Sequence, residues 1–183
     1  FEKSDFTPSG FEYKIGLANE DIPAIEYDVD GKRVYLRGSI DRVDTYEANG
    51  TKYVRVVDYK TYSKYFVAEK VAYGLDTQLL HYLYAYCEKN NTVPAGVFYY
   101  GVTLPNVNIT GHETKEEIAR EIEKTIKRSG IVIDDVDIVR ALSNDLSAVS
   151  ANLKKDGTLY TRGRSKRLYT KEDFDTPETT LKD

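Results

Sequence analysis

The chain contains 183 residues, of which 40% are hydrophobic, and its net charge is −4 at pH 7. This length suits one domain with a substantial core, and the negative charge argues against a simple DNA-binding module, which would normally be basic. An enzyme that gathers divalent cations with carboxylates is not excluded. No stretch approaches the roughly 20 apolar residues of a membrane span.

The first residue and the single cysteine bear on the origin and the cellular compartment of the chain. The sequence begins at Phe1 without a methionine, and we interpret it as a segment of a longer polypeptide. Cys87 alone excludes an internal disulfide framework and a cysteine-based metal site within the segment. We therefore expect a soluble, cytoplasmic protein with no membrane partner.

The first sixty residues predict strands joined by tight turns. Asp30-Gly31 and Asn49-Gly50 are strong hairpin signals, and each lies between segments in which apolar and polar residues alternate. Two hairpins in succession predict an antiparallel meander of three strands. The expected strands cover residues 11–15, 24–29, 32–46 and 52–60.

After residue 73, segments with apolar residues at helical spacing alternate with short apolar runs of strand length. Thr114 and Glu117 form a capping-box pattern at the start of one expected helix. We predict an α/β domain with a mixed, partly antiparallel sheet flanked by helices. Helices are expected at residues 73–89, 114–128 and 136–142, and further strands at residues 96–102 and 131–133.

The composition changes near the C-terminus, where apolar positions become sparse. We predict a core over residues 1–145 and a loosely packed arm over residues 146–183, with one hairpin around Asp156-Gly157. Most of the 16 tyrosines fall at expected strand or helix positions. We therefore expect most of them to be core and rim residues rather than platforms for base stacking.

Three charged residues stand in two of the expected strands: Asp41 in one, and Asp58 with Lys60 in the next. Alternate side chains of a strand share a face, so Asp58 and Lys60 should project together and Tyr59 away from them. A meander could bring Asp41 beside Asp58. Two carboxylates can hold Mg²⁺, which neutralises the charge that develops during phosphodiester hydrolysis, while a lysine ammonium orients the water or stabilises that charge.

Plainer explanations exist for the same residues. An Asp-x-Lys pair on an exposed strand edge is common, because lysines there discourage sheet aggregation. The apolar run of Val54, Val56 and Val57 before Asp58 favours the functional interpretation. Arg42 and Asp44 are interpreted either as a structural pair or as contacts to substrate.

Three motifs in this order resemble the RecB-type nucleases of the PD-(D/E)xK superfamily. They are GSIDRVD at residues 38–44, VDYKT at residues 57–61 and QLLHY at residues 78–82. Flanking segments extend the resemblance to the nuclease domains of AddB-type subunits of bacterial helicase–nucleases, so that it covers most of the chain. These segments are residues 6–12, 94–100 and 129–135.

The resemblance implies a restriction-endonuclease-like fold and a role for each matching residue. Asp41, Asp58 and the backbone carbonyl of Tyr59 would bind Mg²⁺, or Mn²⁺ in its place, and Lys60 would be the catalytic lysine. Gln78 and Tyr82, four residues apart on one helix face, would act at the site and on the DNA backbone. From the residues alone, Gln78 would be interpreted as a helix-surface residue and Tyr82 as a core tyrosine.

The sequence departs from the family in two respects. Members usually supply another metal ligand, a histidine or glutamate, from an upstream helix, and residues 1–30 contain no match. Many also carry an iron–sulfur cluster on four cysteines, which would here require residues outside this segment. His81 and His112 are not in the ligand position, and we interpret them as structural or exposed.

The sequence thus predicts a Mg²⁺-dependent DNA exonuclease domain of a helicase–nuclease that processes the ends of double-strand breaks for recombinational repair. Its expected partners are DNA, delivered as a single strand by a helicase, and an AddA-like partner subunit. The chain itself has no Gly-x-x-x-x-Gly-Lys phosphate loop. The alternatives are another RecB-like or CRISPR-associated nuclease, and an inactive nuclease-fold scaffold that binds DNA or partner subunits.

Overall fold

The structure is a computed structural model. It describes residues 3–62, 64–67, 70–71, 73–102, 113–125, 129–144, 146, 149, 151–160 and 168–175. In chain order the strands are β1 (Thr7–Ile15), β2 (Ile25–Val29), β3 (Lys32–Leu36), β4 (Gly38–Ala48), β5 (Thr51–Lys60), β6 (Val93–Gly101), β7 (Ser129–Ile133), β8 (Asn152–Leu153), β9 (Leu159–Tyr160) and β10 (Leu168–Tyr169). The helices are α2 (Gln78–Asn90), α3 (Lys115–Thr125), α4 (Val136–Leu142) and α5 (Lys171–Asp175).

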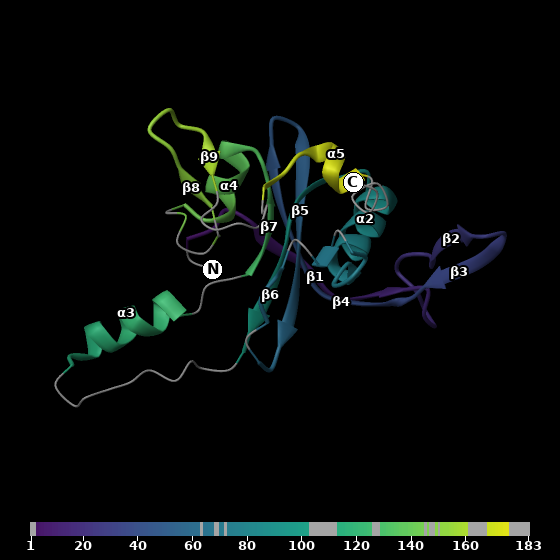
Figure 1. Ribbon diagram of the computed structural model, residues 1–183, viewed down its shortest axis with the longest axis horizontal. Helices are drawn as coiled ribbons and strands as arrows, with labels where there is room; N and C mark the ends of the chain where they lie inside the picture. The colour runs from purple at the N-terminus through teal and green to yellow at the C-terminus, as the bar shows by residue number, and fades with distance from the viewer. Residues whose placement is uncertain are drawn as a thin grey trace.

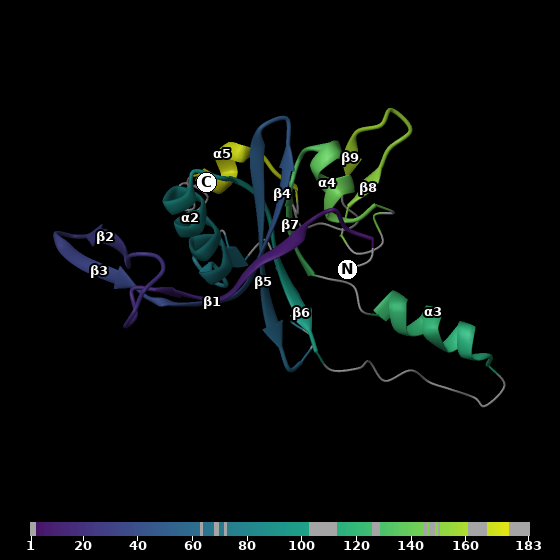
Figure 2. The ribbon, with the colours of Figure 1, turned by 180° about the vertical axis from the view of Figure 1, so that it is seen from behind.

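A six-stranded sheet with the order β1-β4-β5-β6-β7-β10 forms the centre of the molecule. The β5–β6 and β7–β10 pairs are parallel, and the other neighbours are antiparallel. Figure 1 shows the sheet between two layers, with α2 and α5 on one side and α4 with the β8–β9 hairpin on the other. Figure 2 shows the same layers from behind. The prediction of a mixed sheet flanked by helices is confirmed.

None of the helices in the described residues combines the length and the apolar character that a membrane crossing requires.

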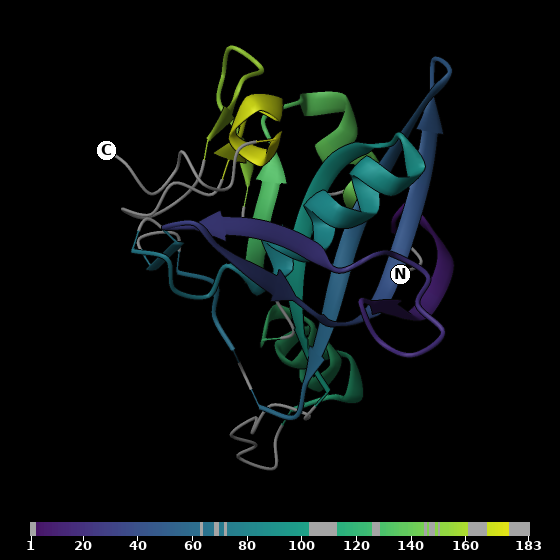
Figure 3. The same ribbon diagram turned by 90° about the vertical axis from the view of Figure 1, so that its right-hand side faces the viewer.

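The predicted meander is wrong at its middle strand. The chain expected to be one strand over residues 32–46 divides at Arg37, so that β3 pairs with β2 in a separate two-stranded ribbon while β4 pairs with β1 and β5. The ribbon and α2 lie in front of the main sheet in Figure 3. A hairpin signal specifies only which neighbours pair locally. Membership of a sheet depends on long-range contacts, here those of β1 with β4.

The boundaries of α2 and α3 show how local chemistry sets helix ends. Helix α2 begins later than predicted because Gly74 and Asp76 have φ angles of 72° and 56°, a left-handed conformation that an α-helix cannot continue. The capping box of α3 is confirmed. The Thr114 hydroxyl accepts from the Glu117 N–H at 3.2 Å, and the Glu117 carboxylate accepts from the Thr114 N–H at 2.8 Å. The predicted end of that helix lies outside the described residues.

Described parts of the expected C-terminal arm pack against the sheet. Strand β10 extends the sheet beside β7, and Tyr169 and Phe174 are buried with their rings 5.4 Å apart. The hairpin expected around Asp156-Gly157 is confirmed as β8–β9. The division into a core over residues 1–145 and an arm over residues 146–183 stays a prediction.

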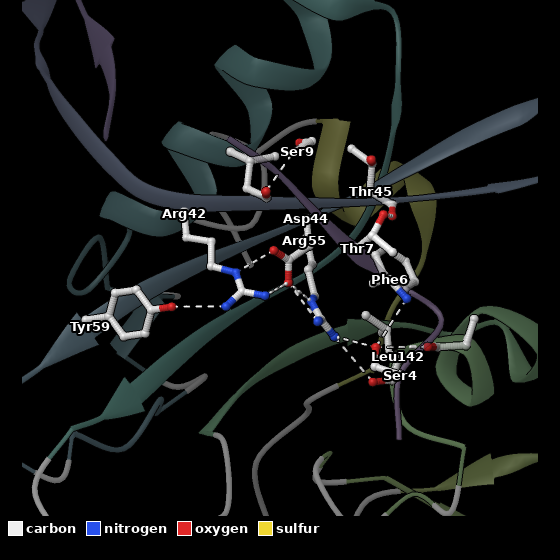
Figure 4. A network of polar contacts seen from close by, with 12 residues as sticks. Ser4, Phe6, Thr7, Ser9, Arg42, Asp44, Thr45, Arg55, Tyr59 and Leu142 are labelled. Atoms are coloured by element: carbon white, nitrogen blue, oxygen red, sulfur yellow. Dashed lines mark hydrogen bonds and ion pairs between the residues drawn. The ribbon is translucent and has the colours of Figure 1, made fainter. Parts of the chain in front are cut away.

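Three buried charged side chains connect β4 to β5 (Figure 4). Arg42 donates through Nε and Nη2 to the two carboxylate oxygens of Asp44, at 2.5 and 3.0 Å, and the Nε of Arg55 donates to Asp44 at 2.7 Å. Arg55 also donates to the Ser4 hydroxyl at 3.0 Å and to the Leu142 carbonyl at 3.3 Å. The Arg42–Asp44 pair is therefore part of a buried network that also ties the N-terminal segment and α4 to the sheet.

We expect Asp44→Ala to lower the free energy of unfolding by about 3–5 kcal/mol, because it leaves two arginines buried without their carboxylate. Urea denaturation followed by circular dichroism measures this change. Glu26→Ala, which removes an exposed pair with Arg33 in the ribbon, serves as the control and should change the same quantity by at most about 1 kcal/mol. Equal effects of the two substitutions would show that the buried network is not what stabilises the sheet.

Candidate active site

Strands β4 and β5 separate at one end of their ladder. Their last register pair is Arg42 with Val57, although β5 continues to Lys60, and continuing the register places Asp41 opposite Asp58. The Tyr59 N–H donates to the Asp41 carboxylate at 2.7 Å, where a backbone carbonyl would accept in a regular ladder. The two acids therefore lie where the strands stop pairing with each other.

Asp58 and Lys60 form an ion pair at this strand end. The Lys60 Nζ lies 2.5 Å from the Asp58 Oδ2, and the side chains of Lys60 and Asp58 are 25% and 9% exposed. Burial raises the pKa of Asp58, the Lys60 ammonium opposes this shift, and the negative charge of Asp41 adds to it. The ionised form of Asp58 is thus disfavoured by burial and by repulsion from Asp41.

The Tyr59 side chain points away from the acids. Its hydroxyl accepts a hydrogen bond from the Nη1 of Arg42 at 3.1 Å, on the side of the sheet where the buried network lies. The structure therefore agrees with the expected alternation, in which Asp58 and Lys60 share one face and Tyr59 takes the other.

The oxygen atoms gathered here suit a hard divalent cation such as Mg²⁺. Asp41 and Asp58 supply carboxylates, and the Tyr59 carbonyl points to the same edge of β5 as its N–H, which faces Asp41. In the part of the chain that the structure describes, no three His, Cys, Asp or Glu residues gather around one point. Two acidic side chains and a backbone oxygen could thus hold a cation, with further ligands to come from water or substrate.

Gln78 and Tyr82 contact each other on α2. The Gln78 amide donates to the Tyr82 hydroxyl at 2.8 Å, and this hydroxyl lies so close to Gly38 that a Cβ there would overlap it. The pair therefore packs against the start of β4. Among the described residues, no hydrogen bond or ion pair joins Gln78 or Tyr82 to Asp41 or Asp58. Their catalytic role stays a prediction.

The structure adds Lys64 and Tyr99, which the sequence did not single out. Tyr99 is the register partner of Asp58 in the parallel β5–β6 pair. The Lys64 Nζ lies 3.0 Å from the Tyr99 hydroxyl and 4.2 Å from the centre of its ring, and the Lys60 Nζ lies 5.9 Å from that centre. No spacing in the sequence could reveal this group, because it depends on β6 lying beside β5.

His81 takes part in a contact away from the acids, between β2 and α2. The Tyr27 hydroxyl and the His81 Nδ1 form a hydrogen bond of 2.7 Å, which connects β2 to α2. His112 lies outside the described residues. Residues 3–30 contain β1, β2 and loops, so the upstream helix of the family is not in this described stretch.

Comparison with known proteins identifies the family. The chain matches the PD-(D/E)XK nuclease superfamily over residues 1–171. The chain belongs to this superfamily. It is also similar to part of the B-type subunit of the ATP-dependent helicase/deoxyribonuclease of three bacteria, which confirms the resemblance to AddB-type nuclease domains.

The three relatives have similar identity and coverage. Identity is 36% over 185 residues in Clostridium acetobutylicum, 37% over 184 residues in Thermoanaerobacter sp. (strain X514) and 36% over 176 residues in Bacillus mycoides (strain KBAB4). The matches cover 96%, 95% and 88% of the chain. They cover only 16%, 16% and 15% of the relatives, so the chain spans a small part of their length.

The raised pKa of Asp58 predicts how the metal-free chain responds to pH. The folded state holds the Asp58 proton more tightly than the unfolded chain does, so this residue's contribution to stability is lost as pH rises through its folded pKa. We expect Asp58→Asn to be more stable than the unaltered chain above that pKa and to have a flatter pH profile. Urea denaturation in EDTA between about pH 4 and about pH 8 measures both.

Asp156 is the matched control, because its pKa is shifted in the direction opposite to that of Asp58. Hydrogen bonds from Thr158 lower the pKa of Asp156, so its contribution is present at neutral pH and is lost as pH falls. Asp156→Asn should therefore lower the stability at neutral pH. If Asp58→Asn also lowered it, burial and the charge of Asp41 would not dominate the environment of Asp58.

Proposed function

We propose that this chain is the nuclease domain of a helicase–nuclease subunit and hydrolyses the phosphodiester bonds of DNA with Mg²⁺, or with Mn²⁺ in its place. The observation that carries the proposal is the meeting of Asp41, Asp58 and Lys60 where β4 and β5 stop pairing. Membership of the nuclease superfamily supports the reaction type. The relatives named as deoxyribonuclease subunits support the larger assembly.

Asp41, Asp58 and the Tyr59 carbonyl are the proposed ligands of the cation. Asp58 is buried, and its ionised form is disfavoured by Asp41, so the site needs either a proton or a cation to relieve the repulsion. When bound, the cation would neutralise charge on the phosphate and lower the pKa of a water molecule. Asp41 has one oxygen on the Tyr59 N–H and a second oxygen to offer.

Lys60 is the proposed catalytic lysine. Its ammonium is held against Asp58 and its side chain is a quarter exposed, so it lies next to both the carboxylates and the solvent. From there it can orient the attacking water or stabilise negative charge on a phosphoryl oxygen. Gln78 is proposed to contact the DNA backbone from α2, and Tyr82, which is buried, is proposed to position the Gln78 amide through its hydroxyl.

The wider role is also proposed. The chain would act on single-stranded DNA delivered by a helicase during the processing of double-strand break ends, in a cytoplasmic complex with an AddA-like subunit. A scaffold that binds DNA without cleaving it is the second candidate. It is favoured by the finding that the described residues bring only two acidic side chains to the candidate site.

Cleavage of labelled single-stranded DNA with Mg²⁺ tests the nuclease proposal, on this chain and on a version extended upstream. We expect Asp58→Ala and Lys60→Ala to lower the cleavage rate by about 100-fold or more, because the first removes a ligand of the cation and the second removes the ammonium that stabilises developing charge. Lys52→Ala, which changes an exposed lysine on the same strand, should leave the rate unchanged. Circular dichroism checks that each variant is folded.

Mg²⁺ titration of the melting temperature separates the two candidates. A nuclease should be stabilised by Mg²⁺, and Asp58→Ala should lose that stabilisation. A scaffold should show neither cleavage nor stabilisation. Full activity of Asp58→Ala would exclude the proposed mechanism.

A further inference from the structure

The described residues between β5 and α2, within residues 61–77, form a loop with a defined inner side; we term it the tyrosine loop. Phe66 and Val71 are fully buried, and the Phe66 N–H donates to the Ser129 hydroxyl at 2.6 Å. Lys64 and Lys70 pair with Asp76 at 3.0 and 3.7 Å. These contacts, with the Lys64–Tyr99 hydrogen bond, attach the loop to β6 and β7.

Three tyrosines of the tyrosine loop have exposed side chains. Tyr62, Tyr65 and Tyr73 are 61%, 69% and 82% exposed. These three are exceptions to the expectation that most tyrosines serve as core and rim residues, because Phe66 and Val71 occupy the buried positions of the loop. Exposed apolar groups that concentrate in one segment often mark a binding surface.

The loop lies next to the candidate active site at its N-terminal end. It begins immediately after Lys60 and ends immediately before Gln78, the first residue of α2. Within it, Lys64 contacts Tyr99, the register partner of Asp58.

The charges of the loop indicate what kind of contact it can make. Its two lysines are balanced in the sequence by Glu69 and Asp76, and the chain as a whole carries a charge of −4. Attraction of the loop to phosphates is therefore weak. Tyrosine rings can instead stack on nucleobases, but only where the base faces are uncovered, as in an unpaired strand.

We propose that Tyr62, Tyr65 and Tyr73 form a stacking platform for the unpaired bases of a DNA strand whose backbone passes Asp58 and Lys60. This inference rests on the proposed nuclease function and assigns the residues that would hold the single strand beside the site. Stacking on the bases holds the strand beside the site, while the sugar–phosphate backbone remains available to the carboxylates and the lysine.

Binding measurements in the Asp58→Asn variant test the platform without cleavage. The probes are a short fluorescein-labelled oligothymidylate and a duplex of the same length, in EDTA, with fluorescence anisotropy as the readout. We expect Tyr62→Ala, Tyr65→Ala and Tyr73→Ala each to weaken single-strand binding about 5- to 150-fold. The corresponding phenylalanine variants should stay within about 2-fold, because the ring that stacks is retained.

Two further readouts separate stacking from other effects. The dependence of affinity on salt concentration should be unchanged in the alanine variants, because no phosphate contact is lost. Tyr35→Ala, which removes a tyrosine of 48% exposure on the β2–β3 ribbon, is the control and should bind as the parent variant does.

Three results would overturn the platform: alanine variants that bind the single strand normally, equal losses for single strand and duplex, or phenylalanine variants as weak as the alanine ones. Normal binding by the alanine variants would assign the surface to another partner, such as a protein subunit. Failure of the nuclease proposal looks different, because the unaltered chain would then bind the single strand through the tyrosines and leave it uncut in Mg²⁺.

Discussion

The buried carboxylate of Asp44 between Arg42 and Arg55 is the interaction on which the site depends. It joins β4 to β5 within the sheet and has hydrogen bonds from both arginines. Arg42 also reaches the Tyr59 hydroxyl, so the same network holds the residue whose backbone N–H binds Asp41. Buried ion pairs stabilise a fold only when their hydrogen bonds offset the cost of removing the charges from water. The network therefore favours the one register of β4 and β5 in which these bonds form. In that register Asp41 lies opposite Asp58.

The site itself contains an electrostatic conflict. Asp58 is buried beside another acid, and the Lys60 ammonium compensates only in part, because the pKa of Asp58 remains above its usual value. Such a group gains from any cation that enters. The sheet supplies the rigidity that keeps the two carboxylates close despite their repulsion. The buried network and the candidate active site therefore lie on different faces of the same two strands.

The sequence predicted the elements well where the signal was local. The capping box of α3, the β8–β9 hairpin and the segment of α4 are all encoded in neighbouring residues. The prediction from sequence failed where an element pairs with residues that are far away in the chain. The chain over residues 32–46 looked like one strand because alternation is the same in a ribbon and in a sheet. The exposure of Tyr62 and Tyr65 could not be predicted because a loop has no periodicity that distinguishes its inner side, and Tyr73 was expected at the start of a helix.

The sequence by itself determined the superfamily, the mixed α/β class and the candidate residues Asp41, Asp58 and Lys60, since motif order and strand alternation are properties of the chain. The tertiary structure alone decided that β1 lies beside β4, that β6 brings Tyr99 and Lys64 to Asp58, and that Asp41 accepts the Tyr59 N–H. The physical reason is that these contacts join segments far apart in sequence, and their free energy depends on packing that no local pattern records.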